Sequence, residues 1–257
     1  MVYQLIGNSD LNSEVGVILP TYGEADNIAN LIDDIENLKL DVSILVIDDS
    51  SPDGTAELVQ QKQSEYTHVM LYSRPKKTGL GTAITDGFKI FLAAQQPPKY
   101  IFTMDADYSH NPQDIPQLLS TMRECDCGIV IGSRYVKGGK IAGWPFTRKI
   151  ISKTANLIAR ASLGLKLKDC TSGFKCFRKS TIEAIDLDTV GSDGYSFQIE
   201  MNYRCMEKGL KIVEVPIIFI DRHAGSSKMS KKIVREAILL VWKLKLGTLM
   251  RRLMGKG

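Results

Sequence analysis

Two acidic side chains separated by one alanine follow a short apolar run in the middle of this 257-residue chain. The run is Tyr100–Met104, and Asp105 and Asp107 come directly after it, with Ala106 between them. Residues i and i+2 of an extended segment point to the same side, so both carboxylates can converge on one divalent cation. The alternative is a turn in which the two acids cap the following helix, which Pro112 opens. The pair alone leaves both interpretations open.

A second acidic cluster and a glycine-containing loop favour the metal interpretation. Asp48 and Asp49 follow the apolar run Ser43–Ile47 and lead into a series of turn-forming residues. The basic loop 76–82, KKTGLGT, lacks the third glycine of a dinucleotide-binding fingerprint and the ending of a Walker loop, so an ordinary loop is its alternative. Two acidic strand ends and such a loop suit a nucleoside diphosphate held by Mg²⁺ or Mn²⁺.

These groups must be positioned by an alternation of strands and helices. Hydrophobic patterns predict strands at residues 15–20, 43–47, 68–73, 100–104 and 128–132, and helices at 27–35, 55–63, 82–94 and 112–123. Such an alternation is typical of an α/β fold of Rossmann type, a mostly parallel sheet with helices on both faces. Ligands of such sheets bind beyond the carboxyl ends of the strands, so we expect both acidic clusters on one edge of the sheet.

The pattern is less regular beyond Gly132. We expect helices at 144–162 and 195–208, a segment of mixed character at 170–178, and a strand at 211–221 that Pro216 breaks, as at a sheet edge. A basic amphipathic helix is expected from about residue 229 to residue 254. The expected organisation is therefore one catalytic domain, residues 1–228, followed by a C-terminal basic helix, residues 229–257.

Composition excludes several classes of protein. Hydrophobic residues make up 44% and charged residues 24% of the chain, which is ordinary for a soluble globular protein. The chain opens on no secretory leader, and it contains no apolar run of the roughly 20 residues needed to cross a bilayer. Its five cysteines are odd in number and scattered, which predicts reduced thiols in a cytosolic setting. Cys125 and Cys127 are too isolated to indicate a zinc or redox site.

The order of the motifs resembles that of a known family. Three segments, 17–28 (VILPTYGEADNI), 48–55 (DDSSPDGT) and 105–110 (DADYSH), resemble the inverting glycosyltransferases of the GT-A fold, family 2. Later segments are similar to the dolichyl-phosphate (polyprenyl-phosphate) mannose synthases within it, in a form without C-terminal transmembrane helices. These segments are 132–135 (GSRY), 144–145 (WP) with Arg148 and Ser152, 169–174 (DCTSGF), 194–200 (GYSFQIE) and 219–222 (FIDR), followed by Gly225 and by 227–228 (SK).

The resemblance implies transfer of mannose from GDP-mannose to a dolichyl or polyprenyl phosphate, which gives polyprenyl-phosphate β-D-mannose and GDP. The alternative donor is UDP-glucose, since relatives that use it share the acidic motifs. The residues that the resemblance places around the nucleotide are Pro20, Tyr22, Glu24, Ile47, Asp49, Met104, Asp105, Ala106 and Lys228.

The same resemblance assigns the reacting groups. Metal binding is implied for Asp105, Asp107 and Ser109, and binding of the acceptor phosphate for Arg134, Arg148 and Ser152. The implied catalytic set is Asp105, Asp107, Arg134, Arg222 and Glu200, with Arg222 and Lys228 at the donor diphosphate. A structural salt bridge on its helix is the alternative role for Glu200. His110 is expected at a helix start rather than on the metal.

The end of the chain suggests how a lipid acceptor is reached. From Lys228 onward there are nine Lys or Arg residues and one acid, and an apolar stripe runs along the expected helix. Apolar burial and attraction to anionic lipid favour peripheral attachment to the cytoplasmic side of a membrane, the endoplasmic reticulum in a eukaryote or the plasma membrane in a prokaryote. A solvated helix packed on the domain and a small membrane-embedded partner subunit are the alternatives. Nucleic-acid binding is not expected, because the tail lacks interleaved aromatic residues.

Overall fold

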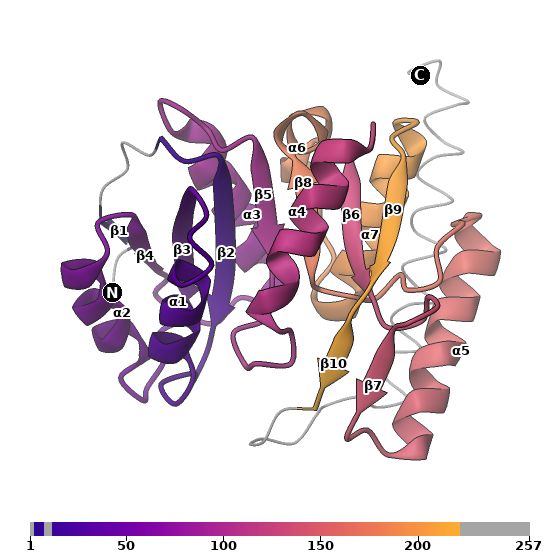
Figure 1. The fold of residues 1–257 in the computed structure, drawn as a ribbon, viewed down its shortest axis with the longest axis horizontal. Coiled ribbons are helices and arrows are strands. Elements are labelled where there is room, and N and C mark those ends of the chain that lie inside the picture. Colours follow the sequence, from indigo (N-terminus) through magenta and orange to yellow (C-terminus); the bar gives the residue numbers. More distant parts are fainter. Residues whose placement is uncertain (1–2, 8–11, 222–257) are drawn as a thin grey trace.

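The structure, a computed structural model, describes residues 3–7 and 12–221 (Figure 1). The predicted C-terminal helix, the predicted domain boundary at residue 228, Arg222 and Lys228 all lie outside the described residues. Within the described ranges, no helix is long and apolar enough to cross a membrane.

One eight-stranded sheet forms the centre of the fold, with the strand order β1-β4-β3-β2-β5-β8-β6-β9. The strands are β1 (Gln4–Ile6), β2 (Val15–Thr21), β3 (Val42–Asp48), β4 (Val69–Ser73), β5 (Tyr100–Thr103), β6 (Ile129–Ser133), β8 (Lys175–Arg178) and β9 (Ile212–Pro216). Neighbours pair in parallel except that β1 is antiparallel to β4, and β8 is antiparallel to both β5 and β6. The predicted mostly parallel α/β sheet is therefore confirmed.

Helices cover both faces of the sheet (Figure 1). They are α1 (Ile28–Glu36), α2 (Thr55–Glu65), α3 (Leu80–Ala93), α4 (Ile115–Glu124), α5 (Phe146–Leu163), α6 (Lys179–Ala184) and α7 (Gly194–Glu207), with short 3₁₀ turns at Pro112–Asp114 and Leu187–Thr189. Successive residues of a strand point to opposite faces of the sheet and pack into two hydrophobic cores, one on each face. Val17 and Leu19 of β2 pack on the side of α1, α2 and α4, whereas Ile18 packs on the side of α3, α6 and α7.

The segment of mixed character at 170–178 contains the strand β8, which the sequence pattern does not predict. β8 inserts between β5 and β6 and runs against both of them. Its sequence, KCFR, begins with a lysine that is fully buried and therefore breaks the expected apolar pattern. The insertion divides the sheet into a half on the β2 side of β5 and a half on the β6 side.

The chain leaves the sheet at Pro216, as the sequence predicts. β9 is the edge strand of the large sheet, and the chain then enters β10 (Ile218–Ile220), which pairs in parallel with β7 (Lys140–Ala142) in a separate two-stranded sheet. The Ile220 N–H donates to the Ser109 carbonyl, 3.2 Å away, so β10 lies beside the loop that carries Asp105 and Asp107.

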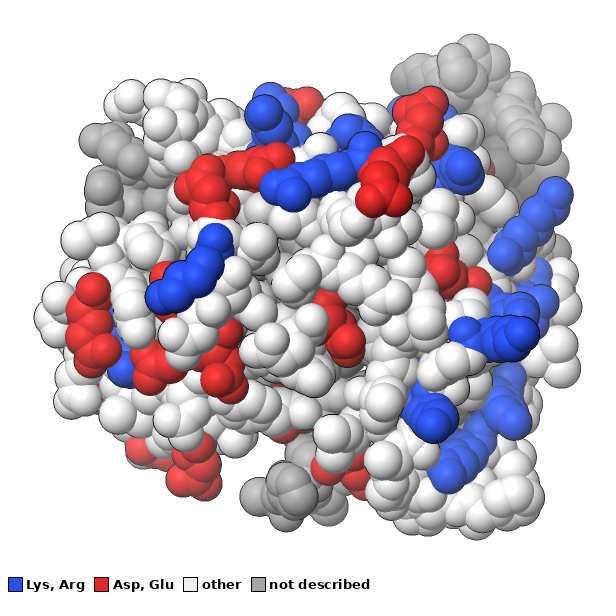
Figure 2. Space-filling model, viewed as in Figure 1, with Lys and Arg blue, Asp and Glu red and all other residues white. Residues whose placement is uncertain are grey.

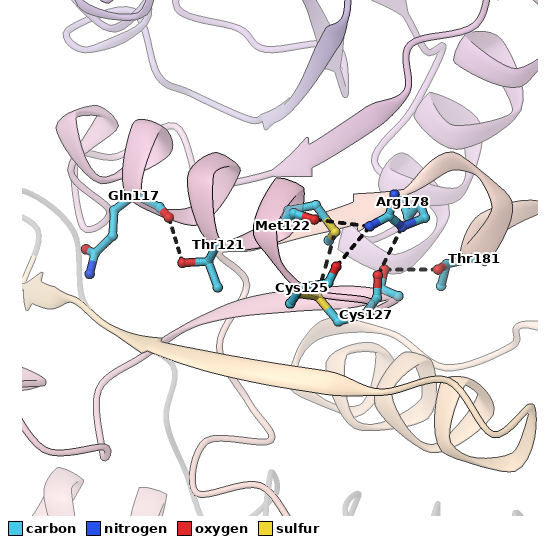
Figure 3. The surroundings of a disulfide bond; sticks show 8 residues. Gln117, Thr121, Met122, Cys125, Cys127, Arg178 and Thr181 are labelled. Atoms are coloured by element: carbon cyan, nitrogen blue, oxygen red, sulfur yellow. Dashed lines mark hydrogen bonds between the residues drawn. A yellow bond between two sulfur atoms is a disulfide. The ribbon is translucent and has the colours of Figure 1, made fainter.

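The prediction that all five cysteines are reduced thiols is wrong for two of them. Cys125 and Cys127, in the turn between α4 and β6, are joined in a disulfide, and their Cα atoms are 5.3 Å apart (Figure 3). This separation lies in the range that a disulfide spans. The shape of a local turn decides such a pairing, which composition does not reveal. The other three cysteines, Cys170, Cys176 and Cys205, are free and buried.

Arg178 at the end of β8 holds the turn that contains the disulfide. Its guanidinium donates to the carbonyls of Met122, Cys125 and Cys127 at 3.1, 3.2 and 3.1 Å (Figure 3). These carbonyls lie at or just beyond the end of α4, where a positive charge also complements the helix dipole. The contact joins α4 to the antiparallel strand on the face opposite α7.

Candidate active site

A cavity of about 260 Å³ opens at the edge of the sheet where β2 and β5 end, which is where the fold class predicts a ligand. It is lined by residues from the ends of β2 and β5, from the loop before β8 and from the first turns of α3 and α7. These residues are Pro20, Glu24, Leu80, Asp105, Ala106, Asp107, Thr171, Gly173, Gly194, Tyr195 and Gln198. Five of them, Pro20, Glu24, Asp105, Ala106 and Asp107, were predicted site residues.

Asp105 and Asp107 lie in the tight loop that follows β5. The Ser109 N–H donates to Asp107 Oδ1 at 3.0 Å, and the Tyr108 hydroxyl donates to Asp34 at 2.7 Å. Tyr108 has a φ of 58°, in the left-handed region that non-glycine residues rarely adopt, so its hydrogen bond offsets backbone strain. The loop is therefore held on both sides of the acidic pair.

His110 braces this loop instead of starting the next helix. Its Nδ1 accepts the Asp105 N–H at 3.1 Å, and its ring packs against Phe174 and Phe219. Burial, opposed by Asp107 and reinforced by Arg134, lowers the pKa of His110 to about 4. A neutral ring is required for Nδ1 to accept a hydrogen bond. The following 3₁₀ turn is capped by Asn111, so the predicted position of His110 at the helix start was wrong.

The residues around Asp107 fit a divalent cation. The Ser109 Oγ, two residues after Asp107 in the same loop, is buried and has no hydrogen-bond partner among the described residues. No cluster of three or more His, Cys, Asp or Glu side chains able to hold a metal is found in the described part of the chain. Two carboxylates without a third protein ligand are typical of Mg²⁺ or Mn²⁺ sites that are completed by substrate phosphates.

Gly173 keeps the space next to Asp105 open. A Cβ at this position would lie 3.3 Å from Asp105 Oδ1, and 3.6 Å from both the Gln198 Nε2 and the His110 Cε1. A contact of 3.3 Å is closer than ordinary van der Waals packing, so a side chain here would crowd the carboxylate. The glycine thus leaves a gap that Asp105, His110 and Gln198 surround.

The second acidic cluster is built differently from the first. Asp48 is buried and accepts hydrogen bonds from Thr21 and Ser51, at 2.9 and 2.5 Å. Asp49 is also buried and forms an ion pair with Arg74, with 2.5 Å between Nε and Oδ1. Neither acid lines the cavity, so Asp49, a predicted nucleotide-binding residue, is here the partner of Arg74.

The other predicted nucleoside residues divide into cavity and core. Pro20 and Glu24 line the cavity, while the side chains of Ile47 and Met104 are buried in the two hydrophobic cores below it. Tyr22 is 46% exposed, and the Lys77 Nζ lies 3.6 Å from the centre of its ring. Ile47 and Met104 are 0% and 1% exposed and do not line the cavity.

The basic loop 76–82 is fastened to the start of α7. The Gly81 N–H donates to Asp193 Oδ1 at 2.7 Å, and Arg74 donates to the Gly79 carbonyl at 3.1 Å. A Cβ on Gly79 would lie 2.5 Å from the Asp193 carboxylate, so only glycine allows this approach. The loop connects the nucleoside side of the cavity to α7 on the opposite side.

The predicted acceptor-phosphate residues lie together beyond the antiparallel strand. Arg134 is buried and donates to Asp169 through both Nε and Nη2 at 2.7 Å. Burial disfavours the charged form of Asp169, but the Arg134 charge and its hydrogen bonds outweigh burial and lower the pKa of Asp169. The Ser152 hydroxyl accepts the Tyr135 hydroxyl at 2.7 Å.

Arg148 is the most accessible of these three residues. Its Nη1 donates to Asp221 at 2.7 Å, and its guanidinium lies 4.0 Å from the centre of the Trp144 ring. Its Nε and the Trp144 Nε1 are buried without hydrogen-bond partners among the described residues. Trp144 is thus buried, whereas Phe146 is 77% exposed.

Glu200 does not line the cavity. It is buried and forms an ion pair with Arg204, one turn later on α7, with 2.6 Å between Oε1 and Nη2. The Ser192 N–H and hydroxyl donate to its other oxygen. These are the contacts of the structural salt bridge, the alternative role that the sequence left open.

Sequence reasoning missed several residues that build the site. Gln198 and Tyr195 line the cavity from α7. Arg74, Asp169 and Lys175 are buried and bind Asp49, Arg134 and the main-chain carbonyl of Gln198, respectively. For α7 a signal was present, because Gly194, Tyr195 and Gln198 share one helical face. For the three buried charges no local pattern identifies the partner.

Comparisons with known proteins agree with this geometry. Residues 16–186 match the model of the family described as glycosyl transferase family 2. The chain belongs to this family. It is 42% identical over 224 residues to a protein of Micrococcus luteus named undecaprenyl-phosphate mannosyltransferase, and the match covers 87% of this chain and 90% of the relative.

Two further relatives have related names. The polyprenol monophosphomannose synthase of Mycolicibacterium smegmatis is 40% identical over 228 residues, covering 88% of this chain and 84% of the relative. The dolichol-phosphate mannosyltransferase of Pyrococcus furiosus is 39% identical over 235 residues, covering 90% of this chain and 63% of the relative. The family predicted from the motifs is therefore confirmed.

Solved structures confirm the GT-A type of fold. A glucosyl-3-phosphoglycerate synthase from Mycobacterium tuberculosis, crystallised with Mn²⁺ and UDP-glucose, superposes with a TM-score of 0.67 at 18% sequence identity. The match covers 91% of this chain and 80% of the other. The same enzyme with Mn²⁺, UDP and its product gives a TM-score of 0.65.

Proposed function

We propose that this glycosyltransferase moves mannose from GDP-mannose to a polyprenyl phosphate, with release of GDP. The names of the three relatives at 39% to 42% identity carry this proposal for acceptor and sugar. The guanosine part of the donor is supported by the motif resemblance and by the placement of Pro20 and Glu24 in the cavity wall.

Asp105, Asp107 and Ser109 would hold Mg²⁺ or Mn²⁺. The cation would offset the charge that develops on the diphosphate as it leaves the sugar. His110 and Tyr108 keep the loop in place, so the carboxylates need little rearrangement when the donor binds. Arg222 and Lys228, which lie outside the described residues, are proposed as further cations for the diphosphate.

The acceptor needs orientation more than activation. A phosphate monoester is already anionic at neutral pH, so its oxygen can attack the anomeric carbon in one displacement that inverts the configuration. Arg148 and the buried Arg134 are proposed to orient this phosphate, together with Ser152. The parallel donors of Arg134 are bonded to Asp169, so Arg134 would act through its charge, whereas the Arg148 Nε has no partner among the described residues and can donate to a phosphate oxygen. No nucleophilic side chain is required for a single displacement.

The lipid acceptor places the enzyme at a membrane surface. Lys and Arg side chains gather over α5, on the side of the molecule that carries Arg148 (Figure 2). The same helix exposes Phe146, Ile150 and Leu157, at 77%, 48% and 62%. Apolar and cationic side chains on one helix favour the interface of an anionic membrane. We propose peripheral attachment on the cytoplasmic side, with residues 229–257 as an anchor and a membrane-embedded partner subunit as the other route.

The donor and the acceptor can be tested together. The protein is incubated with Mn²⁺, phytanyl phosphate and either labelled GDP-mannose or labelled UDP-glucose, and lipid-soluble label is counted. We expect label from GDP-mannose only. Lipid-soluble label from UDP-glucose and none from GDP-mannose would reject the mannosyl donor and support the alternative donor.

The metal assignment has its own control. Asp107→Asn should weaken Mn²⁺ binding in the presence of GDP by at least about tenfold and lower turnover, because one of two carboxylate ligands is lost. Asp188→Asn, in an exposed turn, removes a carboxylate of the same kind and should leave both unchanged. Unchanged Mn²⁺ affinity in Asp107→Asn would contradict the metal site.

Attachment is tested by flotation with anionic liposomes. A chain that ends at Ser227 should float less than the full chain, since it lacks the basic tail. Equal flotation would remove the tail as the anchor.

A further inference from the structure

A buried amide in the wall of the cavity has no hydrogen-bond partner. Gln198 on the second turn of α7 is 3% exposed, and its Nε2 makes no hydrogen bond within the described part of the chain. Burying an amide group without a partner costs about 1–3 kcal/mol. Gln198 also lines the cavity that Asp105 and Asp107 share, so a ligand in this cavity could supply the missing partner.

The start of α7, which carries this amide, is held from two directions. The Lys175 Nζ on β8 donates to the main-chain carbonyl of Gln198 at 3.0 Å, which joins this turn of α7 to the sheet. At the start of α7, Asp193 accepts the Gly81 N–H at 2.7 Å. The helical turn that carries Gln198 is therefore held in place before a ligand binds, which lowers the ordering cost of binding.

The topology indicates which part of the donor reaches Gln198. Pro20 and Glu24 belong to β2 and the loop after it, on one side of β5, and form the proposed nucleoside wall. Asp105 at the end of β5 lies in the middle, where the diphosphate is expected. Gly173 and Gln198 lie on the other side of β5, next to β8. The group that extends past the diphosphate in this direction is the transferred sugar.

Two other polar side chains in this region already have protein partners, unlike the Gln198 amide nitrogen. The Thr171 hydroxyl, also in the cavity wall, already accepts from Arg134 at 2.7 Å and contacts Asp169 and Asn156. Glu200, two residues along the helix, is bonded to Arg204 and Ser192. A sugar hydroxyl can both donate and accept, and therefore matches an amide.

We propose that the Gln198 amide binds a hydroxyl of the transferred sugar and thereby sets the sugar specificity of this enzyme. The proposal rests on the proposed function for the identity of the sugar, but its geometry applies to any nucleotide sugar held at Asp105 and Asp107. An enzyme site that hydrogen-bonds a substrate hydroxyl discriminates strongly against an analogue in which that hydroxyl is missing or misplaced.

The test compares two substitutions at Gln198 with one on the surface. Gln198→Leu removes the amide at similar volume, and Gln198→Glu replaces the donor with an acceptor. Gln117→Leu, on the exposed side of α4, is the matched control. Each protein is assayed for kcat and KM with GDP-mannose and GDP-glucose, for the Kd of GDP and of the donor in the presence of Mn²⁺, and for its Tm.

For Gln198→Leu we expect kcat/KM with GDP-mannose to fall about 10- to 100-fold and the preference over GDP-glucose to shrink. The Kd of GDP should stay within about twofold, because the nucleoside wall is on the other side of β5. The Tm should be unchanged or higher, because a buried amide without a partner is removed. A purely structural role predicts a lower Tm and an unchanged sugar preference.

Failure of this proposal is distinguishable from failure of the proposed function. If the wild-type enzyme uses another nucleotide sugar, the mannosyl function is wrong, and the same comparison is made with that donor. Gln198→Leu should then weaken binding of that donor at least about fivefold and leave the nucleoside diphosphate unaffected. Equal donor affinity and equal sugar preference in Gln198→Leu and wild type would overturn the role of Gln198.

Discussion

Lys175 gives the fold a pH response that can be worked out from the structure. Its side chain is fully buried in β8, and its Nζ donates to the Gln198 carbonyl. Burial lowers the pKa of Lys175 from 10.5 to about 7, although Cys205, Cys170 and Asp169 each act to raise it. The folded protein therefore favours the neutral amine, whereas the unfolded chain keeps the charged form up to about pH 10.

The sign of the effect follows from proton counting. Between about pH 7 and pH 10.5 the unfolded chain binds more protons at Lys175 than the folded protein, so the free energy of unfolding rises with pH. Between pH 7 and pH 9 the gain from this group is about 2 kcal/mol, since a difference of one in pKa corresponds to about 1.4 kcal/mol. Below pH 7 the cost of burying the charge is present in full.

The assay is urea unfolding at pH 7 and pH 9 for wild type, Lys175→Met and Lys179→Met. The wild type should gain about 2 kcal/mol more than Lys175→Met between the two pH values, because Met has no proton to lose. Lys179→Met removes a lysine that is 37% exposed on the next element, and its pH response should match the wild type. Parallel pH responses of wild type and Lys175→Met would refute the argument.

Three further outcomes follow from individual contacts. Asp169→Asn should lower the free energy of unfolding by about 3–5 kcal/mol in urea titrations, because it leaves the Arg134 charge buried and without its counter-charge; a loss below about 1 kcal/mol would contradict this pairing. Gly173→Ala should raise the KM for the donor severalfold at a Tm close to wild type, because its Cβ would crowd Asp105, and an unchanged KM would exclude that crowding. Cys125→Ser should lower the free energy of unfolding by no more than about 2 kcal/mol, since the disulfide closes a very short loop, so a larger loss by thermal or urea unfolding would count against this reasoning.

The parts of the fold that the sequence predicts well depend on local patterns. β2, β3 and β5 are almost wholly apolar runs, and an acidic cluster follows both β3 and β5. Because parallel strands have their carboxyl ends at the same edge of the sheet, the fold class alone predicts that these acidic clusters lie at one edge. The position of Asp105, Asp107, Pro20 and Glu24 around one cavity was predictable for this reason.

The parts that were missed depend on pairing over long distances in the sequence. Arg134 and Asp169 are 35 residues apart, and Arg74 and Asp49 are 25 apart. From the sequence alone, a charged residue that is buried with a distant partner cannot be distinguished from a charged residue on the surface. β8 was missed for the same reason, because its fully buried Lys175 reads as a polar, exposed position. Local periodicity contains no information about these contacts.

In α7 the family motif indicates a segment that reaches the cavity, but the residue of this motif assigned to catalysis, Glu200, is not in the cavity lining. The segment 194–200 is one of the family motifs, and from it Glu200 was predicted as a partner of a sugar hydroxyl or of developing charge, with a structural salt bridge as the alternative. Residues two apart on an α-helix point about 200° away from each other, so Glu200 and Gln198 cannot both face the cavity. The contacts of Glu200 with Arg204 and Ser192 hold it away from the cavity, whereas Gln198 lines the cavity, which is why the proposed sugar contact falls to the amide.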